Sequence, residues 1–205
     1  TRLKLPPFIV TLGTWNIFYA LNLWLSGAQS IRSQDIDANA GALKFFGEAF
    51  KIGSARITFG SLLMIAVFFA LWFLLNKTAW GRHVYAIGGN ELAAKLSGVK
   101  TQMVKLTVYG ISGLTSAFAA LILTGRLMSG QPNAGVGFEL DAIAAVVLGG
   151  TAIAGGRGLI LGTLIGAVLL GILNNGLNLM GINPYLQDVI KGLIILLAIY
   201  IGREW

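Results

Sequence analysis

Long apolar stretches that carry no charged residue alternate with shorter polar segments along most of the chain. Since a charge at the centre of a bilayer costs about 2.5–3.5 kcal/mol on insertion scales, a sufficiently long stretch of this kind predicts a membrane span. About 20 helical residues cross the hydrocarbon core. The stretches that meet this requirement are Leu5–Ile31, Ile57–Asn76, Leu106–Gly125, Gly158–Gln187 and, with two charges near its start, Tyr185–Gly202.

A sixth apolar segment, Ala142–Gly156, is shorter and rich in glycine. As a helix it would reach only about 22 Å, because each residue adds about 1.5 Å. Non-helical backbone at membrane depth is tolerated where other protein shields it. We therefore expect a broken or partly re-entrant element here, within an all-α fold: a polytopic transmembrane helix bundle with one short, glycine-interrupted segment.

Composition supports this fold class. Residues of the AVILMFWYC set make up 56% of the chain and charged residues 11%, against about 25% charged in a typical soluble domain. A soluble globule with so few charges could not cover its surface, so a cytosolic enzyme, a disordered chain and a collagen-like chain are excluded. The chain begins at Thr1 without an initiator Met, and we expect residues 1–205 to form the C-terminal part of a single transmembrane domain.

Six crossings would distribute the charges unequally between the two sides of the membrane. One side holds both chain ends, the loop 77–105 and Arg157, and the net charge of +7 lies entirely there. On the other side, which includes the loop 32–56, basic and acidic residues balance. Because Lys and Arg concentrate in cytoplasmic loops, we expect both chain ends and the loop 77–105 in the cytoplasm. The basic charge then follows from topology, and no nucleic-acid partner is needed to explain it.

A short helix is predicted inside the cytoplasmic loop. Asn90 is a favoured N-cap residue, and Glu91 follows in the first turn, where the helix dipole favours an acid. Gly98 suits the left-handed position that ends many helices. A helix of about two turns does not persist alone in water, so it needs a surface to pack on. Leu92 and Leu96 share one of its faces, and that surface is either the chain's own bundle or a separate subunit.

Four stretches carry long ordered motifs: PPFIVTLGT (Pro6–Thr14), GRHVYAIGGNELAAKLSGVK (Gly81–Lys100), FELDAIAAVVLGGTAIAGGRGLILGTLIGA (Phe138–Ala167) and LNNGLNLMGI (Leu173–Ile182). They resemble the permease subunits of bacterial ABC importers for monosaccharides, of the ribose/xylose/fructose type. The resemblance covers most of the chain outside residues 32–56. It implies a non-catalytic permease in the bacterial inner membrane, which forms the translocation path for a neutral monosaccharide.

The resemblance also implies partners. These are a separate ATP-binding subunit, a second permease copy in a homodimer, and a periplasmic or extracellular sugar-binding protein; no cofactor or metal is implied for the chain itself. The family's internal loop resembles the pattern Glu-Ala-Ala-x-x-x-Gly, which docks in a groove of the ATPase. Here Leu92 stands in place of the Glu, and Glu91 precedes it. The residues implied in ATPase coupling are Asn90, Glu91, Leu92, Ala93, Ala94, Leu96 and Gly98.

Glycines surround the short segment 142–156 and leave two interpretations open. Interrupted helices in transporters often expose backbone groups to the substrate path, whereas glycine also permits tight packing without substrate contact. The candidates for a pathway or gate are Gly149, Gly150, Thr151, Gly155 and Gly156. Three further glycines recur at every fourth residue, the spacing of close transmembrane crossings, and predict helix packing. These three are Gly158, Gly162 and Gly166.

Polar residues near the external helix ends also allow two roles. Asparagines there can bind sugar hydroxyls as part of the pathway, or satisfy one another and neighbouring helices. These asparagines are Asn174, Asn175 and Asn178. Asp141 precedes the short apolar segment and predicts an N-cap; the alternative is that Asp141 and Glu139 meet a binding protein that docks from outside. Asp188 and Lys191 are either a mutually neutralising pair or a proton pathway, and the second role would make the protein an ion-coupled secondary carrier.

Motifs for nucleotide or metal chemistry are missing. The sequence has no G-x-x-x-x-G-K-[ST] pattern, no H-E-x-x-H pattern and no Cys, and its single histidine, His83, reads as a surface residue. We therefore expect transport without covalent chemistry, with ATP hydrolysed by the partner subunit.

Overall fold

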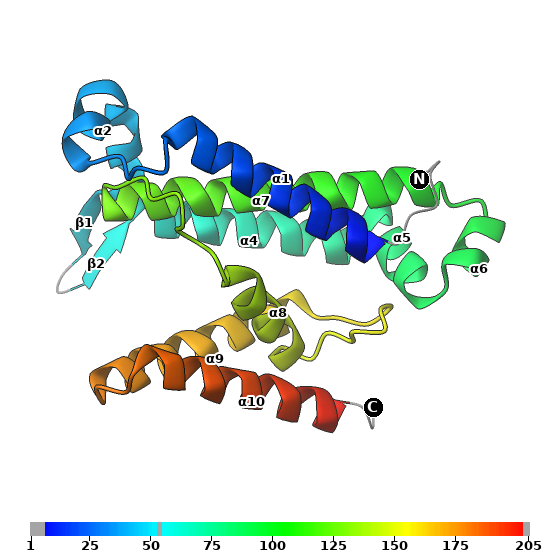
Figure 1. The fold of residues 1–205 in the computed structure, drawn as a ribbon. Helices are drawn as coiled ribbons and strands as arrows, with labels where there is room; N and C mark the ends of the chain where they lie inside the picture. Colours follow the sequence, from blue (N-terminus) through cyan, green and yellow to red (C-terminus); the bar gives the residue numbers. More distant parts are fainter. Residues whose placement is uncertain (1–6, 53–54, 203–205) are drawn as a thin grey trace. The chain divides into compact units, whose positions relative to one another are not determined.

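The computed structural model describes residues 7–52 and 55–202, and most of them are helical (Figure 1). The long helices are α1 (Pro7–Ser26), α4 (Phe59–Lys77), α7 (Thr101–Leu127), α9 (Ile160–Leu179) and α10 (Pro184–Gly202). The shorter helices are α2 (Ser33–Asn39), the 3-10 helix η1 (Gly41–Leu43), α3 (Lys44–Gly47), α5 (Ala79–Gly89), α6 (Glu91–Leu96) and α8 (Phe138–Leu148). The strands β1 (Ala49–Ile52) and β2 (Ala55–Thr58) pair in antiparallel fashion, with Phe50 opposite Ile57.

Three helices in the described part of the chain, α4, α7 and α9, are long and apolar enough to cross a membrane. α1 and α10, with 20 and 19 residues, reach a similar length of about 30 Å. A helix that is apolar on every face needs lipid or other protein around it. The prediction of a helical, membrane-spanning fold is therefore confirmed.

Two predicted spans end earlier than their uncharged stretches, because the backbone turns there. α1 stops at Ser26, before Gly27 and Ala28, which have positive φ angles of 59° and 57°. The stretch 158–187 is not one helix, since Gly181 with a φ of 70° turns the chain before α10 begins at Pro184. Proline is a favoured first residue of a helix. Of the residues expected at the chain ends, Arg2, Lys4, Leu5 and Arg203 lie outside the described residues.

The loop 32–56, for which the sequence predicted no elements, is ordered into α2, η1, α3 and most of the β-hairpin. Its aromatic rings pack on the first residue of α4: Phe59 stacks on Phe45 with ring centroids 4.4 Å apart and lies 5.3 Å from Phe50. Gly47 of α3 lies against the backbone of Gly125 in α7. The loop is therefore a small structured element on the end of α7.

The chain divides into two compact units, Thr1–Ala70 with Lys105–Gly135 and Leu71–Val104 with Val136–Trp205. In the first unit, hydrogen bonds tie α1 to the segment after α7. Asn22 Nδ2 donates to the Pro132 carbonyl at 2.9 Å, and the Tyr19 hydroxyl donates to Asn133 Oδ1 at 2.9 Å. Polar side chains of an otherwise apolar helix are thus satisfied within the protein.

In the second unit, α8 packs against α9 and α10, and α5 packs against α6. The buried cluster between α8 and α9 consists of Ala144, Ala145 and Leu170, with Leu148 beside it. Two of these are alanines, and small side chains allow close approach where lipid gives no hydrophobic driving force.

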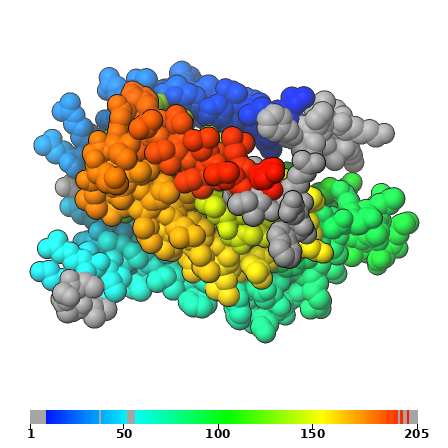
Figure 2. Space-filling view, turned by 90° about the horizontal axis from the view of Figure 1, so that it is seen from below, coloured from blue at the N-terminus to red at the C-terminus, as the bar shows by residue number. Residues whose placement is uncertain are grey.

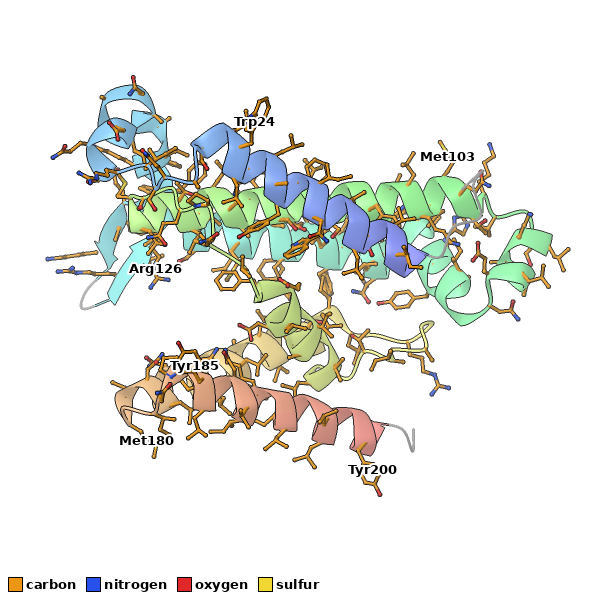
Figure 3. All side chains as sticks on the ribbon, in the orientation of Figure 1. Trp24, Met103, Arg126, Met180, Tyr185 and Tyr200 are labelled. Atoms are coloured by element: carbon orange, nitrogen blue, oxygen red, sulfur yellow. The ribbon has the colours of Figure 1, made fainter. Side chains whose placement is uncertain are left out.

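Large apolar side chains cover much of the surface of each unit. Figure 3 shows Trp24, Met180 and Tyr200 pointing away from the ribbon, and all three are exposed. In Figure 2 the side chains of α9 and α10, orange and red, lie together on one face. Apolar exposure on this scale is unfavourable in water, so these faces require lipid or further protein.

Candidate functional site

The short helix α6 is capped at both ends. Asn90 Oδ1 accepts a hydrogen bond at 3.0 Å from the backbone N–H three residues on. Gly98 has a φ of 85°, and its N–H donates to the Lys95 carbonyl at 3.1 Å. The Val99 N–H donates to the Ala94 carbonyl at 3.1 Å, which completes a Schellman ending. The helix predicted from the sequence and its two caps are confirmed.

The side chains of α6 divide between an inner and an outer face. Ala94 is buried, with 5% of its surface exposed, in a helix that packs on α5. Leu92 and Leu96, one turn apart on the outer face, are 67% and 81% exposed. Ala93 is exposed as well. Of the apolar residues that the resemblance assigns to docking, Leu92, Ala93 and Leu96 are accessible to a partner, whereas Ala94 packs within the chain.

The C-terminal end of α5 meets the glycine-rich segment after α8. The Tyr85 hydroxyl donates to the Gly158 carbonyl at 3.0 Å. One turn further on, the backbone of Gly88 lies directly against that of Gly155 and Gly156. The two segments that the charge pattern places on one side of the membrane, the loop 77–105 and Arg157 with its neighbours, are thus in contact.

Residues 149–159 run without helix between α8 and α9. Gly150, Gly155 and Gly156 have positive φ angles of 80°, 89° and 78°, which residues with a Cβ rarely adopt. α8 itself has 11 residues and spans about 16 Å. The prediction of a short element broken by glycines is therefore confirmed.

The start of α8 differs from the prediction. The N-cap is Gly137, with a φ of 92°, and its N–H donates to Glu139 Oε2 at 3.1 Å. Asp141 lies inside the first turn, so its prediction as N-cap was wrong. The helix begins before the uncharged stretch because the helix dipole favours both Glu139 and Asp141 in the first turn.

α8 and α9 cross at glycines that leave no room for a side chain. A Cβ on Gly162 would overlap the carbonyl oxygen of Gly149, and one on Gly166 would overlap a carbonyl oxygen of α8. A Cβ on Gly158 would lie 2.9 Å from Thr151 Cγ2. Gly149 and Thr151, which the sequence placed at a pathway or gate, therefore take part in the same antiparallel contact as the three glycines assigned to packing.

At the opposite end of α8, Lys191 joins α10 to α8. Its Nζ lies 3.5 Å from Asp141 Oδ1 and 3.5 Å from Asp188 Oδ1. The predicted pairing of Asp188 with Lys191 is confirmed, and Asp141 supplies a second acid. The lysine ammonium thus ties α10 to α8, and its single positive charge balances one of the two acids.

The asparagines of α9 differ in their surroundings. Asn178 Oδ1 accepts a hydrogen bond at 3.0 Å from Gln187, a buried residue of α10. Asn175 is exposed. Asn174 Oδ1 is buried and has no hydrogen-bond partner among the described residues. Asn178 therefore serves helix packing, whereas Asn174 keeps an unused acceptor.

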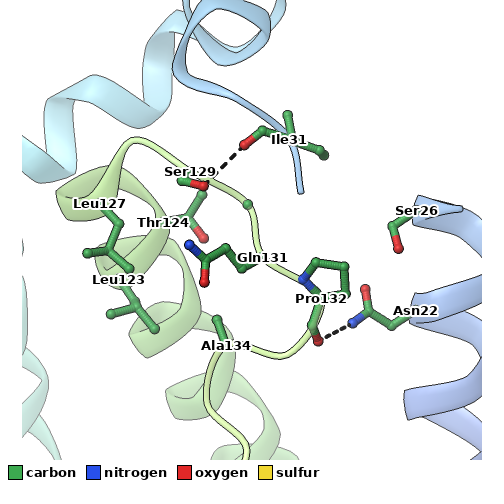
Figure 4. Close-up of a pocket in the computed structure, with 11 residues that line it drawn as sticks. Asn22, Ser26, Ile31, Leu123, Thr124, Leu127, Ser129, Gln131, Pro132 and Ala134 are labelled. Carbon is green, nitrogen blue, oxygen red and sulfur yellow. Dashed lines mark hydrogen bonds between the residues drawn. The ribbon is translucent and has the colours of Figure 1, made fainter. Parts of the chain in front are cut away.

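The first unit contains a pocket of about 220 Å³ between α1, the end of α7 and residues 129–134 (Figure 4). Ser129 Oγ donates to the Ile31 carbonyl at 3.3 Å, and Asn22 bonds to Pro132 across the rim. The sequence analysis missed this pocket because its walls come from segments far apart in the chain. Its polar lining is uncharged and comes from Asn22, Ser26, Thr124, Ser129 and Gln131.

A family model described as branched-chain amino acid transport system / permease component matches residues 1–199. The chain is 47% identical to the fructose import permease protein FrcC of Rhizobium meliloti, over 98% of this chain and 56% of that protein. It is 48% identical to the ribose import permease protein RbsC of Bacillus subtilis (strain 168), over 100% of this chain and 62% of that protein.

A third relative, the galactose/methyl galactoside import permease protein MglC of Escherichia coli (strain K12), is 41% identical over 96% of this chain and 58% of that protein. The chain thus spans 56% to 62% of the length of these three relatives. No solved structure matches. The resemblance to importer permeases that the motifs carry is confirmed.

Proposed function

This chain belongs to the ABC-importer permeases described as the permease component of branched-chain amino acid transport systems, and from that premise we propose that it helps to import a neutral monosaccharide. It would form part of the translocation path, and a separate subunit would hydrolyse ATP. The observation that carries the proposal is α6, a capped helix of six residues with two leucines exposed on one face.

We propose that α6 docks on the ATP-binding subunit through Leu92, Ala93 and Leu96. Burying one leucine side chain contributes about 1.5–3 kcal/mol. The caps at Asn90 and Gly98 hold the helix in shape beforehand, which lowers the ordering cost of docking. Glu91 lies in the first turn of α6, where the helix dipole favours an acid, and this position supports a role in holding the N-terminus of the helix.

A neutral, hydroxyl-rich substrate agrees with the chemistry of the chain. The pocket of Figure 4 is lined by uncharged side chains, and hydroxyl groups need hydrogen-bond partners rather than counter-ions. The three relatives are named as import permeases for fructose, ribose and galactose/methyl galactoside. Asn174 and Asn175 remain our candidates for the path, and the unused acceptor of Asn174 supports this role, since a sugar hydroxyl could donate to it.

We further propose that the protein lies in the bacterial inner membrane, with both ends of residues 1–205 on the cytoplasmic side. The concentration of the net charge of +7 on one side supports this orientation. A second permease copy would complete the path, and an external sugar-binding protein would deliver the substrate. The apolar faces that each unit exposes need to be covered, and this supports contact with a second permease copy as well as with lipid.

An ion-coupled carrier is the alternative function, and it would depend on Asp188 and Lys191. The network with Asp141 supports a structural role for Lys191, because its charge is already neutralised within the unit. A carrier would transport without nucleotide and stop when the proton gradient is removed. In the same vesicles, an ATP-driven importer would require nucleotide and would continue to transport when the proton gradient is removed.

The docking proposal is tested by Leu96→Asp in the full-length permease, with co-purification of the ATP-binding subunit as readout. Because the leucine is exposed, the variant should fold, yet lose at least about tenfold in ATPase affinity, since 1.4 kcal/mol corresponds to tenfold. Met180→Asp, at an exposed apolar residue just after α9, is the matched control and should bind normally. ATPase binding by Leu96→Asp as tight as that of Met180→Asp and the unmodified permease would refute docking through α6.

A further inference from the structure

At Gly88, Gly155 and Gly156, the contact between α5 and the segment 149–159 is made of backbone. A Cβ on Gly155 would lie 2.5 Å from the Gly88 carbonyl oxygen, and one on Gly88 would lie 2.6 Å from the Gly156 nitrogen. Real Cβ atoms do not approach closer than 3.0 Å, so something would have to shift. Because no flexible side chain separates the two segments, neither can move toward the other without displacing it.

On one side of this contact, α6 is connected to α5 through Asn90 alone. The Asn90 N–H donates to the Ala86 carbonyl of α5 at 3.0 Å, while its side chain caps α6. The two helices also pack against each other. A displacement of α6 therefore reaches α5 without an intervening flexible linker.

On the other side, the segment 149–159 leads directly into α8 and α9. These helices meet where Gly162 lies against Gly149, a crossing that likewise has no space for a side chain. A force applied to Gly155 and Gly156 therefore acts on the α8–α9 pair as one piece.

We propose that this contact transmits the movement of α6 to α8 and α9. We call it the glycine junction; it consists of Gly88, Gly155 and Gly156 and includes the hydrogen bond from Tyr85 to the Gly158 carbonyl. The inference rests on the proposed function, since it takes α6 as the helix that the ATPase moves. It goes further by naming the receiving element and by giving Gly155 and Gly156 a mechanical role in place of substrate contact.

The junction is tested in the full-length permease bound to its ATP-binding subunit, with no sugar required. A spin label is placed at Ile153→Cys, an exposed position of the segment 149–159, in a chain whose residues 1–205 contain no other cysteine. The readout is the change in label mobility on adding ATP, and co-purification of the ATPase is measured in parallel.

The decisive variant is Gly88→Ala, and its control is Gly89→Ala. A Cβ on Gly89 would meet its nearest neighbour, the Gly156 Cα, at 3.8 Å, which is ordinary van der Waals contact. Gly88→Ala should keep ATPase binding while reducing the ATP-dependent change about tenfold, within the range expected for positions in a coupled network. Tyr85→Phe, which removes one hydroxyl, should reduce it about threefold even if Gly88→Ala perturbs folding.

An undiminished ATP response in both Gly88→Ala and Tyr85→Phe would overturn the proposal. So would a loss of ATPase binding in both variants as complete as that of Leu96→Asp, because the junction would then only hold α6 in place. Failure of the unmodified permease to bind the ATPase would instead refute the proposed function, so the two failures are distinguishable.

Discussion

The Gly162→Ala substitution, which adds one methyl group, should destabilise the crossing of α8 and α9. In Gly162→Ala the new Cβ would overlap the carbonyl oxygen of Gly149, and backbone cannot rotate aside as a side chain can. Overpacking costs about 1–3 kcal/mol, and a clash with backbone belongs at the upper end. Gly162 is the third residue of α9, where alanine gains less than the about 1 kcal/mol that it has over glycine in a helix interior, so the net destabilisation should be at least about 2 kcal/mol.

Gly171→Ala is the matched control in the same helix. A Cβ at Gly171 meets no atom within 4 Å, and this glycine lies in the helix interior, so the variant should gain about 1 kcal/mol without a clash. The two variants should therefore differ by about 3 kcal/mol, which for a chain of this size corresponds to about 6–12 °C in Tm. Far-UV circular dichroism of the purified chain in detergent, recorded against temperature, measures the difference. Identical Tm values would show that the helices do not cross at these glycines.

Other contacts give further predictions. Asn90→Ala removes the N-cap of α6 and should destabilise the helix by about 1 kcal/mol, seen as about fivefold faster amide exchange at residues 91–97. Asp141→Asn should lower Tm more than Asp188→Asn, because the Asp141 side chain is 38% exposed and joins two helices, whereas that of Asp188 is 75% exposed and pairs within α10. Lys191→Met should leave ATP-driven uptake in vesicles intact, because we assign this residue to structure and not to proton transfer.

Each of these has a result that contradicts it. Unchanged exchange in Asn90→Ala would mean that tertiary packing alone holds α6. A larger effect of Asp188→Asn would place the important ion pair within α10. Loss of uptake in Lys191→Met, with binding of the ATPase retained, would favour the ion-coupled alternative.

The features that the sequence predicted correctly depend on local signals. The N-cap at Asn90 and the left-handed Gly98 lie within a few residues of the helix that they end, so α6 could be predicted with its bounds. The membrane-spanning character of α4, α7 and α9 depends on uncharged length, which the sequence states directly. The close crossing was also indicated by a local signal, the spacing of Gly158, Gly162 and Gly166 at every fourth residue.

What the sequence could not supply is the partner of each residue. Gly88 and Gly156 are both visible as glycines, yet no pattern indicates that their backbones touch. Gly137 caps α8 with a positive φ, and the two acids after it place the predicted helix start too late, since a charge also marks the end of an uncharged stretch. Asp141 could be recognised as a charge at a helix end, but its ion pair with Lys191 depends on the packing of α10 on α8.

The accessibility of a single cysteine at Leu96 tests the central claim most directly. Leu96 is 81% exposed, and residues 1–205 contain no native cysteine, so Leu96→Cys can be labelled selectively with a membrane-impermeant maleimide. We predict no labelling in intact cells, labelling in inverted membrane vesicles stripped of the ATPase, and protection when the ATPase is added back. Labelling from outside intact cells, or labelling in vesicles that the ATPase does not reduce, would contradict a cytoplasmic docking role for α6.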